Sequence, residues 1–228
     1  MRSDLFSEHQ EVETSGQGHP MVLQNRRMVK MHLRPPQIPA VMARQGAMVA
    51  YQGDVRFAYQ SAGVGGLIKK AVTGEGLPLM RVEGHGDVFF AADAQELFLV
   101  DLEDDALSVN GRNVLAFDPG LSWDIRKVGG AGMLGGGLFD TVLSGRGRVA
   151  VSAYGDPVVL RTDEAPTYVD TQSVICWSAN LQTELKKSFS AGALVGRGSG
   201  EAFQLGLHGP GFVVVQASEG PTVPPHSH

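Results

Sequence analysis

Cysteine, long apolar segments and an export signal are what this sequence lacks, and each absence excludes a class of protein. The 228 residues include one cysteine, Cys176, which excludes an intramolecular disulfide and a zinc ribbon and indicates a reducing compartment. No apolar stretch approaches the ~18 residues that a membrane-spanning helix needs. Residues 1–20 are acidic and contain no apolar core, so they predict no signal peptide. We therefore expect a cytoplasmic protein without a transmembrane segment.

The net charge limits the possible partners, and the glycine content limits the possible folds. A net charge of −5 and a pI near 5.8 argue against a general affinity for nucleic acid, so a nucleic-acid partner is not expected. Apolar residues make up 43% of the chain, which is enough for a core. Glycine accounts for 30 of the 228 residues. Because glycine weakens helices and permits positive φ, this content predicts many short strands and tight turns.

A G-x-G motif followed by an apolar run occurs three times, at spacings of 61 and 64 residues. The three glycine pairs are Gly84/Gly86, Gly145/Gly147 and Gly209/Gly211. Upstream of each pair, an apolar segment ends in a small residue followed by an aromatic one, at spacings of 66 and 60 residues. These small residues are Ala50, Ala116 and Cys176. Two sets of positions in the same order predict three copies of one unit of about 60 residues.

The repeated unit predicts strand, turn, variable loop, strand, glycine kink and strand. Glycine inside a strand marks a bulge or a bend of the sheet, which is typical of a barrel or sandwich. A unit of about 60 residues is too short to bury its strands alone, and no Pro/Ser-rich linker separates the copies. We therefore predict an all-β protein with three internal repeats in one pseudo-threefold β-sandwich or barrel domain. The predicted boundaries are a tail 1–20, the domain 21–218 with repeats of about 38–100, 101–160 and 161–218, and a tail 219–228.

The motifs that would carry chemistry give weak signals. Gly130–Gly135 matches the dinucleotide fingerprint G-x-G-x-x-G, but no helix pattern and no suitably placed acid follow, which favours a loop. Cys176 takes the place of two alanines in the other copies, which favours a buried strand residue over a nucleophile. The sequence predicts no catalytic residue, no metal ligand and no cofactor, and therefore no enzyme.

Two charged features recur between copies. The acidic pairs Glu103-Asp104 and Asp163-Glu164 align, and we interpret them as hairpin tips, although paired acids could also serve as general acid and base or as calcium ligands. A dibasic pair follows the turn in each copy, and pseudo-threefold packing would gather six cations into one rim. The rim consists of Lys69, Lys70, Arg126, Lys127, Lys186 and Lys187. Solubilising lysines are the simpler interpretation, and binding of an anionic ligand is the functional one.

Four blocks together resemble the altered inheritance of mitochondria family over about residues 21–218. They are QGAMVAYQGDV, GEGLPLMRVEGHGDVFFA, VLAFDPGLSWDI and GEAFQLGLHGPGFVVVQ. The family has bacterial members of uncharacterised function and a fungal mitochondrial relative linked to inner-membrane organisation. The resemblance implies a fold similar to the tryptophan RNA-binding attenuation protein, and it implies no catalytic residues.

Two functional hypotheses follow. The first is a non-enzymatic binding or scaffold module that forms a homo-oligomer and acts through an unidentified protein partner, because β repeats present edges that invite assembly. The alternative is a protein that binds an anionic small molecule, lipid headgroup or nucleic acid through the dibasic rim. A cysteine- or metal-dependent enzyme would require Cys176 to be exposed.

Overall fold

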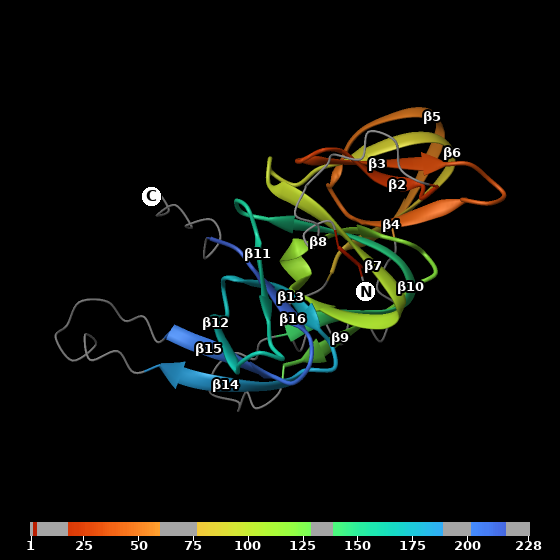
Figure 1. The fold of residues 1–228 in the computed structure, drawn as a ribbon. Helices are drawn as coiled ribbons and strands as arrows, with labels where there is room; N and C mark the ends of the chain where they lie inside the picture. The colour runs from red at the N-terminus through yellow and green to blue at the C-terminus, as the bar shows by residue number, and fades with distance from the viewer. Residues whose placement is uncertain (1, 4–17, 60–76, 129–138, 189–201, 218–228) are drawn as a thin grey trace, which may run out of the picture.

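The computed structural model describes residues 2–3, 18–59, 77–128, 139–188 and 202–217, and these segments form strands almost throughout (Figure 1). The helical element among them is a single 3-10 turn, η2 (Gly111–Asn113), capped by the Asn110 side chain. The strands are β1 (Arg2–Ser3), β2 (Met21–Asn25), β3 (Met28–Leu33), β4 (Ala40–Arg44), β5 (Met48–Tyr59), β6 (Leu79–Phe90), β7 (Glu96–Val109), β8 (Val114–Phe117), β9 (Ser122–Lys127), β10 (Phe139–Ala153), β11 (Val158–Arg161), β12 (Thr167–Asp170), β13 (Val174–Ser178), β14 (Gln182–Ser188), β15 (Ala202–His208) and β16 (Phe212–Val215). The prediction of an all-β fold is confirmed.

The strands form two sheets, and every pairing is antiparallel. In the larger sheet the order is β11-β16-β13-β7-β10-β8-β4-β6-β3-β2, with β1 on β7, β5 on β6 and β9 on β10. The smaller sheet has the order β12-β15-β14. The long strands β7 and β10 pair over almost their whole length, so they connect the parts of the larger sheet.

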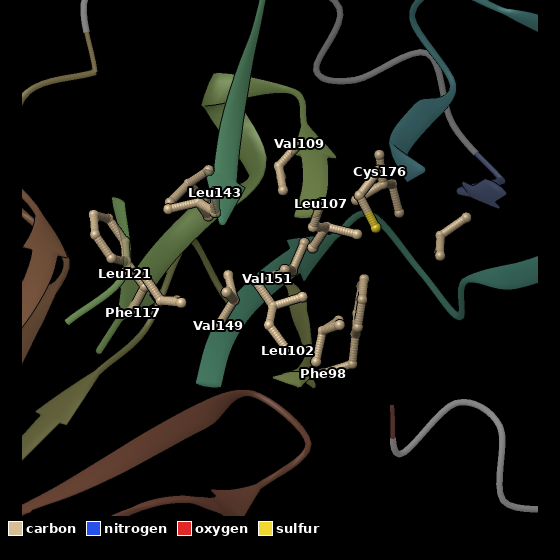
Figure 2. Packing of buried hydrophobic residues seen from close by; sticks show 14 of the residues in the cluster. Phe98, Leu102, Leu107, Val109, Phe117, Leu121, Leu143, Val149, Val151 and Cys176 are labelled. Atoms are coloured by element: carbon tan, nitrogen blue, oxygen red, sulfur yellow. The ribbon is translucent and has the colours of Figure 1, made fainter. Parts of the chain in front are cut away.

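The central strands are buried on both faces, and this explains their continuous apolar runs. In β10, Val149 and Val151 pack into one hydrophobic cluster while Ala150, between them, packs into another. Successive strand residues point to opposite faces, so an unbroken apolar run marks a sheet that is covered twice. Figure 2 shows the first cluster, in which Cys176 lies among Leu107 and its neighbours. A third cluster lies between β12, β13, β15 and β16.

The acidic pairs lie in different settings, and the prediction of hairpin tips is wrong for both. Asp163 and Glu164 lie in a turn between β11 and β12, but β11 pairs with β16 and β12 with β15, so the turn connects two sheets and closes no hairpin. Glu103 and Asp104 lie instead inside β7, at an exposed stretch where the register with β10 shifts between Gly145 and Arg146. Asp104 has a φ of 64°, which belongs to this bulge. A polar run on the exposed part of one long strand has the same sequence pattern as a hairpin tip, so the sequence could not distinguish the two.

Candidate functional site

Three strands that the sequence aligns differ in how many neighbours they have. β8 pairs with β10 on one side and β4 on the other, and β13 pairs with β16 and β7. Within the described part of the chain, β5 pairs with β6 alone. Burial follows this difference, because Ala116 in β8 and Cys176 in β13 are both 0% exposed while Ala50 in β5 is exposed. One side of β5 is therefore an open edge, which we call the β5 edge.

β4 pairs along one edge of β8, and β7 pairs along one edge of β13. We call β4 and β7 covering strands and β8 and β13 covered strands, and the two pairs have matching registers. Ala43 of β4 lies opposite Ala116, and Val109 of β7 lies opposite Cys176. One residue further along, Met42 lies opposite Phe117 and Ser108 opposite Trp177. The covering residues Ala43 and Val109 occupy the same place in their own strands, each directly before a tight turn.

The tight turns identify the corresponding residue in the third covering strand. Each turn is closed by a backbone hydrogen bond between residues three apart. These bonds are Ala47 N to Arg44 O at 3.1 Å, Asn113 N to Asn110 O at 2.8 Å, and Ser173 N to Asp170 O at 3.0 Å. The residue before each turn is Ala43, Val109 or Val169, and on the far side these face Met80, Thr141 and Leu205 in the same register. β12, which contains Val169, is thus placed like β4 and β7.

β12 is the one covering strand without a strand to cover. Among the described residues it pairs with β15 only, so its other side is a second open edge, the β12 edge. Tyr168 on this strand is 46% exposed. Among the described strands, none covers the β5 edge, and none is covered by the β12 edge. A strand placed like β12 is therefore what the β5 edge needs as its neighbour. The internal repeat itself stays a prediction.

The β5 edge carries exposed apolar side chains and little charge. Val49, Tyr51 and Tyr59 are 52%, 48% and 73% exposed. The rings of Tyr51 and Phe57 meet edge-on with centroids 5.3 Å apart. Six residues of straight strand span about 20 Å, so β5 bends between them, where Gly53 has a φ of 103°. Over its twelve residues β5 has one acid, one base, no lysine and no proline.

The dibasic pairs occupy strand positions where the structure describes them. Arg126 and Lys127 are exposed at the end of β9, and Lys186 is exposed on β14, followed by Lys187 in the same strand. Successive strand residues point to opposite faces, so the side chains of Arg126 and Lys127 do not converge. Lys69 and Lys70 lie outside the described residues, as does the glycine run Gly130–Gly135. The six-cation rim therefore stays a prediction.

Lys186 belongs to a polar cluster on the smaller sheet. Its Nζ lies 2.9 Å from Glu184 Oε1 and 3.0 Å from the Tyr168 hydroxyl, and 4.3 Å from the Tyr168 ring centroid. His208 Nε2 lies 3.0 Å from the same carboxylate oxygen. The hydrogen bonds from Lys186 and His208 lower the pKa of Glu184, and those to Tyr168 and Glu184 raise the pKa of Lys186. This lysine is already neutralised by a carboxylate of its own strand.

Burial decides the chemistry of the single thiol. Cys176 lies in the core, as the sequence predicts, and burial raises its pKa far above the ordinary value. A buried, protonated thiol is neither a nucleophile nor a metal ligand. Within the segments that the structure describes, no three His, Cys, Asp or Glu side chains gather in a way that could hold a metal ion. In the same segments, no helix is long and apolar enough to cross a membrane.

Comparison with known proteins places the chain in a family and supports the fold. The profile of the family described as "Mitochondrial biogenesis AIM24" matches residues 21–218. Seven solved chains match the structure. Among them is the crystal structure of protein SPYM3_0169 from Streptococcus pyogenes, with a TM-score of 0.69 and 20% sequence identity over 87% of this chain and 92% of that one. The search of curated proteins found no match.

Proposed function

We propose that this chain, which belongs to the mitochondrial biogenesis AIM24 family as its sequence blocks predict, is a non-enzymatic scaffold module that assembles by strand pairing between copies. In this assembly the β12 edge of one copy pairs with the β5 edge of the next. The observation that carries the proposal is the exposure of Ala50 at a position where its two counterparts, Ala116 and Cys176, are fully buried under a neighbouring strand.

The register of the proposed contact follows from the two pairings inside the chain. Val109 lies opposite Cys176 and Ala43 opposite Ala116, so Val169 would lie opposite Ala50 of the next copy. By the same rule, Tyr168 would lie opposite Tyr51. An unpaired strand edge presents unused backbone donors and acceptors, which another chain can satisfy.

The composition of the edges supports pairing at β5 in particular. Proteins protect open edges with lysine, proline or short strands. β9 and β14 carry dibasic pairs, and β11 is four residues long and preceded by Pro157. β5 has none of these features, and its single acid and single base leave it neutral. A chain with a net charge of −5 repels its own copies, so a neutral strand is a suitable place for contact.

Because the two edges differ, the assembly is head-to-tail, and this makes it testable by complementation. Ala50→Lys places a charge at a residue that pairing would bury, and Tyr168→Glu places one opposite Tyr51. We expect the wild-type protein to self-associate as its concentration rises and each variant alone to stay monomeric in sedimentation velocity. An equimolar mixture should form a dimer that does not grow, because one intact β12 edge meets one intact β5 edge. Val158→Lys, on an exposed residue of β11, is the matched control and should assemble like the wild type.

Three results would contradict the proposal. The first is a wild-type protein that remains monomeric over a wide concentration range. The second is a Tyr168→Glu variant that assembles normally, which would indicate pairing of β5 with a second β5 or another surface. The third is a mixture of the two variants that does not form a dimer although each is folded by circular dichroism.

A protein partner and a cytoplasmic location belong to the same proposal. A scaffold acts by bringing other proteins together, and the acidic pI of 5.8 favours partners with a basic surface. The buried Cys176 thiol supports a non-enzymatic role, since it removes the side chain best suited to nucleophilic catalysis. Affinity purification of the wild-type and Ala50→Lys proteins, compared by mass spectrometry, would show which partners depend on assembly.

Anion binding at the end of β9 is a second candidate, favoured by the adjacent and exposed cations Arg126 and Lys127. Their side chains point to opposite faces, so the site would hold an extended anion rather than a single phosphate. Replacement of both residues by Glu should abolish salt-sensitive binding to a polyanion such as heparin. Retention equal to that of the wild type on a heparin column would remove this candidate.

A further inference from the structure

A hollow of about 800 Å³ opens where three tight turns come together. The three turns lie before β5, β8 and β13, and they contribute Arg44, Arg112 and Gln172 to its wall. The turn between β6 and β7 completes the wall with Asp93 and Gln95. The volume lies within the range of roughly 300–1,000 Å³ that is typical of small-molecule sites.

Two guanidinium groups are fixed in this wall by backbone contacts. Arg44 Nη1 donates to the Arg112 carbonyl oxygen at 2.6 Å, and Arg112 Nη2 donates to the Gln172 carbonyl oxygen at 2.7 Å. Each contact holds the group through one nitrogen, and no carboxylate of the described residues forms a salt bridge with either arginine. The remaining N–H groups of both forks can therefore meet an anion, for which the planar fork is the suited donor.

Two residues of the same wall carry a buried amide oxygen that has no hydrogen-bond partner among the described residues. They are Gln95 Oε1 and Asn113 Oδ1, on side chains of residues that are 8% and 1% exposed. The orientation of Asn113 is set by its Nδ2, which donates to the Ser152 carbonyl oxygen at 2.7 Å. Its Oδ1 is consequently left as a buried acceptor without a donor, on a residue that lines the hollow. A buried acceptor without a donor is unfavourable, and a ligand hydroxyl is a donor that would satisfy it.

We propose that this hollow is a binding site for a small phosphate monoester that also carries hydroxyl groups, of the class of a sugar phosphate. The phosphate binds between the Arg44 and Arg112 forks, and the hydroxyls donate to Gln95 Oε1 and Asn113 Oδ1. Neither arginine lies in the β5 or β12 edge, but Val49 of the β5 edge also lines the hollow.

Isothermal titration calorimetry with three probes separates the two halves of the site. The probes are glucose 6-phosphate, inorganic phosphate and glucose. We expect the wild-type protein to bind glucose 6-phosphate with a Kd of about 1 mM or tighter, inorganic phosphate more weakly, and glucose without measurable heat. Arg44→Gln and Arg112→Gln should each weaken glucose 6-phosphate at least about tenfold, since each removes a charge-assisted contact. Arg161→Gln, at an exposed arginine of β11 outside the hollow, is the control and should bind like the wild type.

A fourth variant tests the hydroxyl half alone. Gln95→Met keeps the length of the side chain and removes its acceptor, so it should lower the preference for glucose 6-phosphate over inorganic phosphate by about fivefold and leave phosphate binding unchanged. Thermal melting of each variant shows that it is folded. The proposal is overturned if none of the probes binds the wild type, or if the two hollow variants bind like Arg161→Gln. Equal wild-type affinities for glucose 6-phosphate and inorganic phosphate would overturn the role of the amide oxygens.

Discussion

At the scale of single residues, Ala50 is exposed in β5, whereas Ala116 in β8 and Cys176 in β13 are buried. The alignment of Cys176 with Ala116 predicts a small buried side chain, and both residues are fully buried. The same alignment includes Ala50, which is exposed. Burial of a strand residue depends on a neighbouring strand from elsewhere in the chain, so residue type alone could not separate Ala50 from its counterparts. The exposure of Ala50 is the observation that supports the proposed contact.

Gly84 is a position where only glycine fits. Its φ is 130°, and an added Cβ would lie 2.1 Å from the Asp54 carbonyl oxygen of the paired strand. Because the obstacle is backbone, it cannot move aside as a side chain could. We expect Gly84→Ala to lower the free energy of unfolding by about 3 kcal/mol or more, from positive φ and the collision together.

The matched control for Gly84 is Gly155, which has a φ of 78° and no atom within 4 Å of an added Cβ. Gly155→Ala meets the strain of positive φ alone and should cost about 1–2 kcal/mol. Urea denaturation with linear extrapolation measures both values. Equal losses in the two variants would show that the collision at Gly84 contributes nothing.

At the scale of elements, an ion cluster joins β3 to β6. Asp87 of β6 lies directly opposite His32 of β3, with Nδ1 2.9 Å from its Oδ1. Lys30 Nζ and Arg34 Nη2 approach the same carboxylate at 3.0 and 2.7 Å. Burial alone would raise the pKa of Asp87, but the hydrogen bonds from Lys30, His32 and Arg34 outweigh it and lower the pKa to about 2.

This cluster predicts a pH dependence of stability. A carboxyl group whose pKa is lower in the folded state stabilises the protein above its unfolded pKa of 3.8 and loses this contribution as the pH falls toward about 2. We expect Asp87→Asn to cost about 1–2 kcal/mol at pH 7, after allowance for solvent screening, and progressively less between pH 4 and about pH 2. Urea denaturation of both proteins at several pH values tests this. A difference that stays constant down to pH 2 would contradict it.

Elements also show where sequence patterns reach their limit. Glycine spacing and apolar runs predicted the strands and the positions of the bends, because both depend on local backbone geometry. The Glu103-Asp104 bulge was misread as a hairpin tip because the partner strand that makes β7 continuous, β10, is distant in sequence. The hollow was not predicted at all. Arg44 and Arg112 belong to different turns, and the pairing of β4 with β8 brings them together.

At the scale of the whole molecule, three similar covering strands serve only two covered ones within the described part of a single copy. β4 covers β8 and β7 covers β13, which leaves β12 and β5 at opposite ends of this series. If β12 of one copy pairs with β5 of the next, as proposed, the series continues from copy to copy, either into a closed ring or into an open chain. The matching registers fix which residues meet, and they do not fix the angle that decides between these two outcomes.

Hydrogen exchange measured by mass spectrometry at low and high protein concentration tests this continuation without any mutation. Alternate amides of an edge strand point away from its neighbour and exchange readily unless a further strand pairs with them. We expect peptides that cover β5 (Met48–Tyr59) and β12 (Thr167–Asp170) to gain protection as the concentration rises. Peptides that cover β9 and β14, whose edges carry dibasic pairs, should exchange at the same rate at both concentrations. Ala50→Lys should remove the gain at both β5 and β12. Protection that rises at β5 while β12 is unchanged would indicate that two β5 strands pair, and the head-to-tail assembly would then be wrong.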